Sequence, residues 1–299
     1  MSTTVLFDRP GPRMRRRIMV GSILTGLGLG ILVILGLVRL AAGGQLTEEK
    51  WGPIINPANP FFVALWANLG LALLHNIEAA GLAMVFSLLL GTVLAVTRIS
   101  LPHWGRWTVV VPMEFFRGLP VVIAIFFASR ILPELGVGLP LLWYLVIGLT
   151  TYNSVIIAEV VRAGIASLPH GQFEAAAAVG LTRGQALRAI LLPQAVRVML
   201  PALISQLVVI FKDTSLGFAI LYGEAVRFVA IAIQELHNPL QLYLTIGTLF
   251  ILINYGLSKL AVWTERRLTH RGQPGPVVQE RADAMPVDPV FAGTSSAGG

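Results

Sequence analysis

The sequence predicts an all-α integral membrane protein with about six transmembrane helices. Of its 299 residues, 55% are hydrophobic and only 12% are charged, which is more apolar surface than a soluble core of this length buries. The apolar residues gather in six segments, each long enough to cross a hydrocarbon layer of about 30 Å as a helix of roughly 20 residues. The basic residues gather in the segments that would lie on one side of the membrane, as the positive-inside rule requires.

The six expected spans follow one another along the chain, and the connection after the fourth is the longest. The first span follows a basic N-terminal segment, residues 1–17, and its start resembles a secretory signal. Its apolar run exceeds the roughly 7–15 residues of a signal core, so we expect an additional N-terminal helix that is retained. The spans are expected at residues 18–42, 66–97, 108–131, 141–166, 198–222 and 240–263.

The distribution of basic residues assigns an orientation to these spans. With a cytoplasmic N-terminus, only Lys50, Arg130 and Arg227 fall in outer segments, and fourteen arginines fall in inner ones. Both termini and the loop at 167–197 are therefore predicted to face the cytoplasm. Residues 272–299 are rich in Pro, Gly, Ser and Ala, and we expect a disordered cytoplasmic tail there. The inner arginines are Arg9, Arg13, Arg15, Arg16, Arg17, Arg98, Arg106, Arg183, Arg188, Arg197, Arg266, Arg267, Arg271 and Arg281.

The loop at about 167–197 is too long and too regular for a simple turn. Pro169 suits the first turn of a helix, and the run from Phe173 to Ala178 has high helix propensity. Gly180 is placed to end that helix in a left-handed conformation. The loop is therefore predicted to begin with a short helix that is followed by a reversal of direction.

A second short helix is expected after this reversal. Thr182 stands three residues before Gln185, which is the spacing of a capping box. The helix should run toward Leu192 and stop at Pro193, a helix breaker. The two helices together predict a helix-turn-helix on the cytoplasmic face.

This loop resembles the EAA loop of permeases from ATP-binding-cassette (ABC) importers. The similarity lies in Glu174-Ala175-Ala176, Gly180 after three further residues, and Ile190 to Pro193 after nine more. The resemblance implies a coupling helix that docks in a groove of a nucleotide-binding subunit. The alternative is an amphipathic helix that rests on lipid. The residues that the resemblance assigns to ATPase coupling are Glu174, Ala175, Ala176, Gly180, Leu192 and Pro193.

Motifs on either side of the loop narrow the resemblance to the polar amino acid branch, which comprises histidine, glutamine and glutamate permeases. Two positions depart from the family pattern: Leu119 stands where Thr is common, and Ala163 replaces a usual Gly. The resemblance therefore implies the fold of the family more directly than it implies which residues of this chain line the pore. The motifs are Arg117-Gly118-Leu119-Pro120, Glu159 to Ile165 with Leu168 to Gln172, and Lys212 to Leu216.

The resemblance covers about residues 66–263 and implies a type I importer permease, with a MetI-like core of five spans plus the extra helix at 18–42. It implies a multi-pass protein of the bacterial cytoplasmic membrane, in contact with lipid. It also implies three protein partners: an ATPase subunit that holds ATP and Mg²⁺, an extracytoplasmic solute-binding protein, and a second, identical or related permease. Glutamate or aspartate is the first expected substrate; glutamine, histidine, arginine and cystine are alternatives.

Several polar side chains fall inside the expected spans, where each charge costs about 2.5–3.5 kcal/mol on insertion scales. Such residues must face protein or water. Arg117 stands beside a backbone that Gly118 and Pro120 should interrupt, and broken backbone at membrane depth is tolerated where it lines a cavity. The alternative for each residue is structural pairing, as for Glu159 with Arg162 three residues on. The substrate-path candidates are Arg117, Tyr152, Asn153, Glu159, Lys212, Asp213 and Thr214.

Other functions find little support in the sequence. It has no Gly-x-x-x-x-Gly-Lys-Ser/Thr loop, so this chain is not expected to hydrolyse ATP or to bind a cofactor. It has no cysteine, no His-Glu-x-x-His pair and no Gly-x-Ser-x-Gly elbow, so neither a metal site nor an intramembrane hydrolase is predicted. No nucleic acid partner is expected. An ion-coupled secondary transporter is disfavoured because two halves with matching interrupted helices are not evident.

Overall fold

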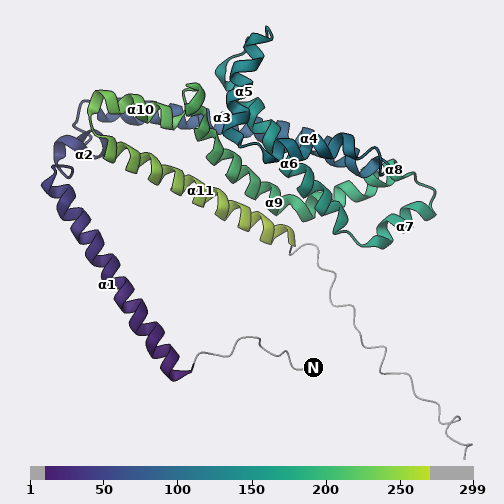
Figure 1. Cartoon of the computed structure of the whole chain (residues 1–299), viewed down its shortest axis with the longest axis horizontal. Coiled ribbons are helices and arrows are strands. Elements are labelled where there is room, and N and C mark those ends of the chain that lie inside the picture. The colour runs from purple at the N-terminus through teal and green to yellow at the C-terminus, as the bar shows by residue number, and fades with distance from the viewer. Residues whose placement is uncertain (1–10, 270–299) are drawn as a thin grey trace, which may run out of the picture.

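The computed structural model describes residues 11–269, and every regular element within that range is a helix (Figure 1). The expected tail at 272–299 and the first part of the basic N-terminal segment lie outside the described residues. The elements are α1 (Pro12–Ala42), α2 (Glu48–Ile55), α3 (Phe62–Ser100), α4 (Trp107–Gly118), α5 (Val121–Glu134), α6 (Leu141–Ala166), α7 (His170–Ala178), α8 (Arg183–Ala186), the π-helix η1 (Leu187–Leu191), α9 (Leu192–Asp213), the 3-10 helix η2 (Thr214–Ile220), α10 (Ala225–Leu236) and α11 (Pro239–Thr269).

Six units of the described chain are long and apolar enough to cross a membrane. Four are the single helices α1, α3, α6 and α11. The fifth runs without a sharp bend over Gly184–Ile220, and the sixth is the bent pair of α4 and α5. The prediction of an all-α membrane protein with about six spans is confirmed.

The third span is broken where the sequence predicted a break. The axes of α4 and α5 differ by 103°, and the turn is made by Leu119 and Pro120. Leu119 is extended, with φ −84° and ψ 128°, because the ring of a following proline disfavours the helical region for the residue before it. Pro120 then caps α5 with φ −56°. Figure 1 shows α5 turned away from the direction of α4.

Pro193 does not end a helix, so the expectation that it acts as a breaker is wrong. The chain instead widens into one π-helical stretch, Leu187–Leu191, and Pro193 lies in the first turn of α9. The N–H of Leu192 donates to the carbonyl of Leu187, five residues back. Because the π-helical turn before Pro193 is wider than an α-turn, the helix continues past a residue that has no N–H to donate. The fifth span therefore begins in the predicted loop.

Two short helices were not expected from the sequence. α2 and α10 lie at one end of the bundle, and α7 and α8 lie at the other (Figure 1). The two unexpected helices, α2 and α10, contribute to a hydrophobic cluster with α3 and α11, in which Ile54, Leu69, Val229 and Leu242 are buried. Tertiary burial of one face therefore stabilises helices too short to be stable alone.

α3 and α6 form the centre of the bundle and approach each other closely at glycine. A Cβ atom on Gly91 of α3 would lie 2.7 Å from the carbonyl oxygen of Ser154 in α6. On the other side of α6, a Cβ on Gly148 would lie 2.5 Å from the Cα of Ile125 in α5. Small residues at such crossings allow membrane helices to pack backbone against backbone.

α1 stands apart from this bundle. None of its 31 residues is buried, and Figure 1 shows it leaving the end near α2 at an angle to the other helices. The assignment of this helix as an addition to a core of five spans stays a prediction.

Candidate functional site

The loop that the sequence predicted to be a helix-turn-helix has the first helix and the turn, but its second helix is not short, because it continues into the fifth span. After α7, the N–H of Gly180 donates to Ala177 O at 3.0 Å, and the N–H of Leu181 donates to Ala176 O at 3.1 Å. Gly180 has φ +81°. These two bonds with a left-handed residue make a Schellman motif, which satisfies carbonyls at the end of α7.

The predicted capping box is also present. The N–H of Thr182 donates to Gln185 Oε1 at 2.9 Å, and the N–H of Gln185 lies 3.4 Å from Thr182 Oγ1. Each side chain therefore faces the backbone of the other residue, and the start of α8 is fixed close to the end of α7.

The side chains of the coupling motif divide between a buried and an exposed set. Ala176 is only 1% exposed and packs against the rest of the loop. Glu174, Ala175 and Gly180 are exposed, whereas Leu192 is half-buried. Glu174 is the fifth residue of α7, beyond the first turn, so the helix dipole contributes little to its stability there. The motif thus presents an exposed carboxylate on a helix that is anchored by alanine.

An apolar pocket of about 220 Å³ lies where this loop joins the bundle. Its wall combines the end of α3, the end of α6, α7 and η1. A hydrogen bond of 3.2 Å from Gln194 Nε2 to Gln172 Oε1 also ties α9 to α7. The lining residues are Ile99, Ser100, Ile165, Ala166, Leu168, Pro169, Phe173, Leu187 and Leu191.

Arg117 lies in the last turn of α4, at the break in the third span. Its Nη1 is 3.6 Å from Glu114 Oε1, and both side chains are 55% exposed. The ion pair between Glu114 and Arg117, three residues apart, is thus present and lies on the surface of the chain. An exposed pair of this kind contributes little to stability.

Glu159 is held by two arginines. Arg162 Nε donates to Glu159 Oε2 at 2.8 Å, and Arg98 at the end of α3 donates to Oε1. The second bond joins α3 to α6 and was not expected from the sequence. This arrangement favours the structural alternative for Glu159.

Asn153 likewise joins two helices. Its Oδ1 accepts from Gln206 Nε2 of α9 at 2.7 Å, and its Nδ2 donates to Leu149 O at 2.8 Å. Asn153 is fully buried, whereas the neighbouring Tyr152 is half-buried. Asn153 therefore has both ends of its amide engaged within the bundle.

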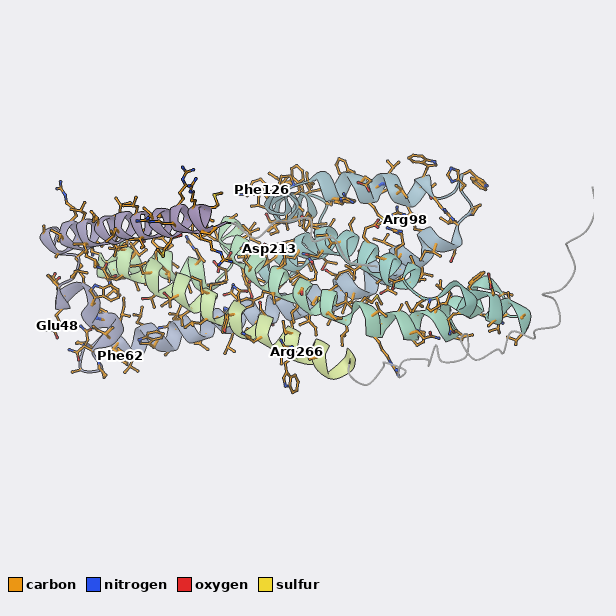
Figure 2. The ribbon with its side chains drawn as sticks, turned by 90° about the horizontal axis from the view of Figure 1, so that it is seen from below. Glu48, Phe62, Arg98, Phe126, Asp213 and Arg266 are labelled. Carbon is orange, nitrogen blue, oxygen red and sulfur yellow. The ribbon has the colours of Figure 1, made fainter. Side chains whose placement is uncertain are left out.

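The polar block after Ile210 marks a change of helix type. α9 ends at Asp213, and the chain tightens into the 3-10 helix η2 from Thr214 onward, so the segment is overwound and not unwound. Lys212 is exposed, Asp213 is half-buried and Thr214 is buried. Figure 2 shows Asp213 in the middle of the long axis and Arg98 nearer the end that holds α7 and α8.

Lys212 and Ser215 lie on the wall of an open groove of about 690 Å³ between α9, α10 and α11. The rest of the wall is mainly apolar. A cation at the edge of an apolar groove can bind a carboxylate, whereas the hydroxyl of Ser215 already donates to Lys212 O at 2.8 Å. The remaining lining residues are Val208, Val209, Val226, Tyr243, Ile246, Gly247, Phe250, Ile251 and Asn254.

The family model described as binding-protein-dependent transport system inner membrane component matches residues 87–270. This range covers more than half of the chain and includes the whole loop from α7 to η1. The chain belongs to this family. The permease is therefore a membrane component of a transport system that works with a binding protein, and it is not the catalytic subunit.

Named relatives of the permease agree. The glutamate transport system permease protein GluD of Corynebacterium glutamicum is 39% identical over 235 residues, which are 77% of this chain and 83% of that protein. The crystal structure of an amino acid ABC transporter with histidines is 26% identical, with a TM-score of 0.63 over 69% of this chain and 96% of that one. An inward-facing structure of the MetNI methionine transporter, at 19% identity and a TM-score of 0.59 over 67% of this chain, shows the same fold. The expected MetI-like permease fold is confirmed.

The permease also holds two polar residues, Asn76 and Glu224, that the sequence did not single out. Together with the candidate Thr214 they form a buried cluster that joins α3, η2 and α10. Glu224 caps α10 by accepting the N–H groups of Val226 and Arg227 at 2.8 and 2.7 Å. Glutamate is not among the preferred N-cap residues, so no signal in the sequence indicated this cap, and nothing in the sequence shows that Glu224 faces Asn76.

The environment of this cluster changes two pKa values. Burial raises the pKa of the Glu224 carboxyl, against the opposing effect of the two backbone N–H groups and Asn76. Burial also raises the pKa of Tyr222 to about 12, and the carboxylates of Glu78 and Glu224 act in the same direction. Tyr222 is therefore neutral at physiological pH and able to donate its hydroxyl proton.

Proposed function

We propose that this permease carries a polar amino acid, first of all glutamate or aspartate, through the membrane as part of an ABC importer. The observation that carries the proposal is the likeness to a glutamate permease over most of both chains. The geometry supports it, because an exposed acidic helix suits docking to an ATPase and a basic groove suits a carboxylate. Glutamine, histidine, arginine and cystine are the alternative substrates.

Three partners belong to this proposal. The exposed face of α7, with Glu174, meets a nucleotide-binding subunit that supplies ATP hydrolysis and holds ATP and Mg²⁺. An extracytoplasmic binding protein delivers the substrate at the end of the bundle near α2 and α10. A second permease closes the groove beside Lys212, because a groove that is open along one side cannot exclude water from a charged substrate.

The substrate-path candidates separate by how their polar atoms are used. Arg117 and Lys212 are exposed and are proposed to receive carboxylates, with Asp213 and Tyr152 beside the path. Three other candidates bind neighbouring helices and are proposed to shape the path without touching the substrate. They are Asn153, Glu159 and Thr214.

Uptake by the reconstituted complex tests the function. The permease, its ATPase and its binding protein are placed in liposomes, and uptake of labelled glutamate, aspartate, glutamine, histidine, arginine and cystine is measured. We expect uptake of glutamate or aspartate that requires ATP and the binding protein. Uptake driven by an ion gradient without ATP would instead establish a secondary transporter.

Removal of a proposed carboxylate-binding cation should weaken transport. A hydrogen bond to a charged group contributes about 1.5–3 kcal/mol, so Lys212→Ala and Arg117→Ala should each lower uptake at limiting substrate by roughly 10-fold or more. Co-purification of the ATPase should stay unchanged. Lys259→Ala is the control, because Lys259 lies over the ring of Tyr255 at 5.3 Å and outside the groove. Normal uptake by either variant would mean that the replaced residue has a structural role and does not bind the substrate.

Cysteine labelling tests the proposed orientation. The chain has no cysteine, so Ser167→Cys and Glu134→Cys each introduce one thiol. In right-side-out vesicles a membrane-impermeant maleimide should label the thiol at position 134 and leave that at 167 unlabelled until the membrane is opened. The reverse result would invert the topology.

A further inference from the structure

The buried amide of Asn76 binds two segments that are far from it in the sequence. Asn76 is 0% exposed in the middle of the apolar helix α3. Its Nδ2 donates to Thr214 Oγ1 at 2.8 Å and lies 3.4 Å from Glu224 Oε2, and its Oδ1 accepts from the N–H of Ala225 at 3.0 Å. One side chain thus fixes the start of η2 and the start of α10 together.

The hydrogen bonds of this cluster fix the orientation of the Asn76 side-chain amide. The hydroxyl of Thr214 donates its single proton to Phe211 O at 2.6 Å, so toward Asn76 it can only accept. The carboxyl oxygens of Glu224 accept the N–H groups of Val226 and Arg227, and the N–H of Ala225 faces Asn76 Oδ1. The amide of Asn76 therefore fits in one orientation, with its nitrogen toward both oxygens.

The turn between η2 and α10 is held by the same part of α3. His75 Nδ1 lies 2.8 Å from Gly223 O, which requires a proton on Nδ1, and Tyr222 Oη donates to His75 O at 3.3 Å. Leu221, within this turn, has φ +62° although its side chain is large. A bulky residue keeps such a conformation only where its surroundings enforce it.

These contacts bear on the groove because Thr214 follows Lys212 and Asp213 directly. The chain changes from α to 3-10 geometry at Thr214, so a displacement of Thr214 would move the backbone of Lys212 and Ser215 on either side of it. Resting on the function proposed above, we propose that Asn76 is a positioning residue for substrate transfer: through Thr214 it holds Lys212 and Ser215 at the wall of the groove.

The test compares import with ATP hydrolysis in the reconstituted complex. Thr214→Val removes the hydroxyl at nearly constant volume, and Thr214→Ser keeps it. A lost buried hydrogen bond at this position should lower the number of amino acids imported per ATP hydrolysed by at least about fivefold in Thr214→Val and in Asn76→Leu. Thr214→Ser should keep the wild-type ratio. Thr245→Val is the matched control, because Thr245 Oγ1 donates only to Gln241 O, in its own helix, at 2.8 Å.

A second measurement does not depend on transport. With Lys212→Cys as the single thiol, its rate of reaction with a charged methanethiosulfonate reagent should change at least about fivefold when Thr214→Val is added, and should not change with Thr245→Val. Unchanged labelling, or an equal fall of import and ATP hydrolysis, would overturn the positioning role. A wild-type complex that imports no amino acid but shows the labelling change would instead count against the proposed function alone.

Discussion

Glu174→Lys is expected to abolish co-purification of the permease with its ATPase. Glu174 is exposed on α7, and the proposed docking would bury it against a partner. Placing the wrong charge in a desolvated pair costs about 2–5 kcal/mol, which corresponds to roughly 30-fold or more in affinity. Substrate-stimulated ATP hydrolysis should fall with it. The measurement is affinity purification of the tagged permease followed by ATPase assay in liposomes.

Gly180→Val should have the same consequence through the backbone. Gly180 has φ +81°, and nothing lies within 4 Å of an added Cβ, so the cost comes from the left-handed conformation, about 1–2 kcal/mol for a residue with a side chain. Relief of that strain would tilt α8 relative to α7. Gly184→Val is the matched control, since Gly184 is also exposed and uncrowded but has no positive φ.

Both variants leave the spans unchanged, so insertion and folding should be normal. If Glu174→Lys and Gly180→Val keep the ATPase and full stimulated turnover, the helix rests on lipid and does not couple. If Gly184→Val loses the ATPase as well, the loop is sensitive to any bulk and the backbone argument fails.

Gly148→Ala is expected to prevent stable folding of the membrane core. A Cβ there would lie 2.5 Å from Ile125 Cα and 2.7 Å from Ile125 N. These are backbone atoms of α5, so the clash cannot be relieved by a side-chain rotation, and the two helices must separate. Overpacking of this kind costs about 1–3 kcal/mol or more. The yield of monodisperse permease in detergent, and its melting temperature, should both fall.

Gly81→Ala is the control for this substitution, because Gly81 lies in α3 with nothing within 4 Å of an added Cβ. It should fold like the wild type or slightly better, since alanine favours a helix over glycine by about 1 kcal/mol. Equal yield and melting temperature for Gly148→Ala and Gly81→Ala would mean that α5 and α6 do not cross as described.

Local features of this protein could be predicted from the sequence because their causes are local. The spans follow from runs of apolar residues, the break at Pro120 from proline stereochemistry, and the turn at Gly180 with the box of Thr182 and Gln185 from capping rules. The same local reasoning was wrong at Pro193, where a π-turn lets the helix continue. A breaker ends a helix only if packing does not favour its continuation.

Which polar side chains meet was decided by the tertiary structure. Spacing along one helix indicated the pairing of Glu159 with Arg162, but Arg98 reaches the same carboxylate from α3, 61 residues away in sequence. Asn76 meets Thr214 and Glu224 across 138 and 148 residues. A helix pattern gives the face on which a residue lies, whereas its partner depends on how three helices cross, and that depends on close contacts such as the one at Gly148. The sequence by itself therefore determined the spans, the loop and the candidate residues, and only the packing of the helices decided which candidates are bound to protein and which are exposed.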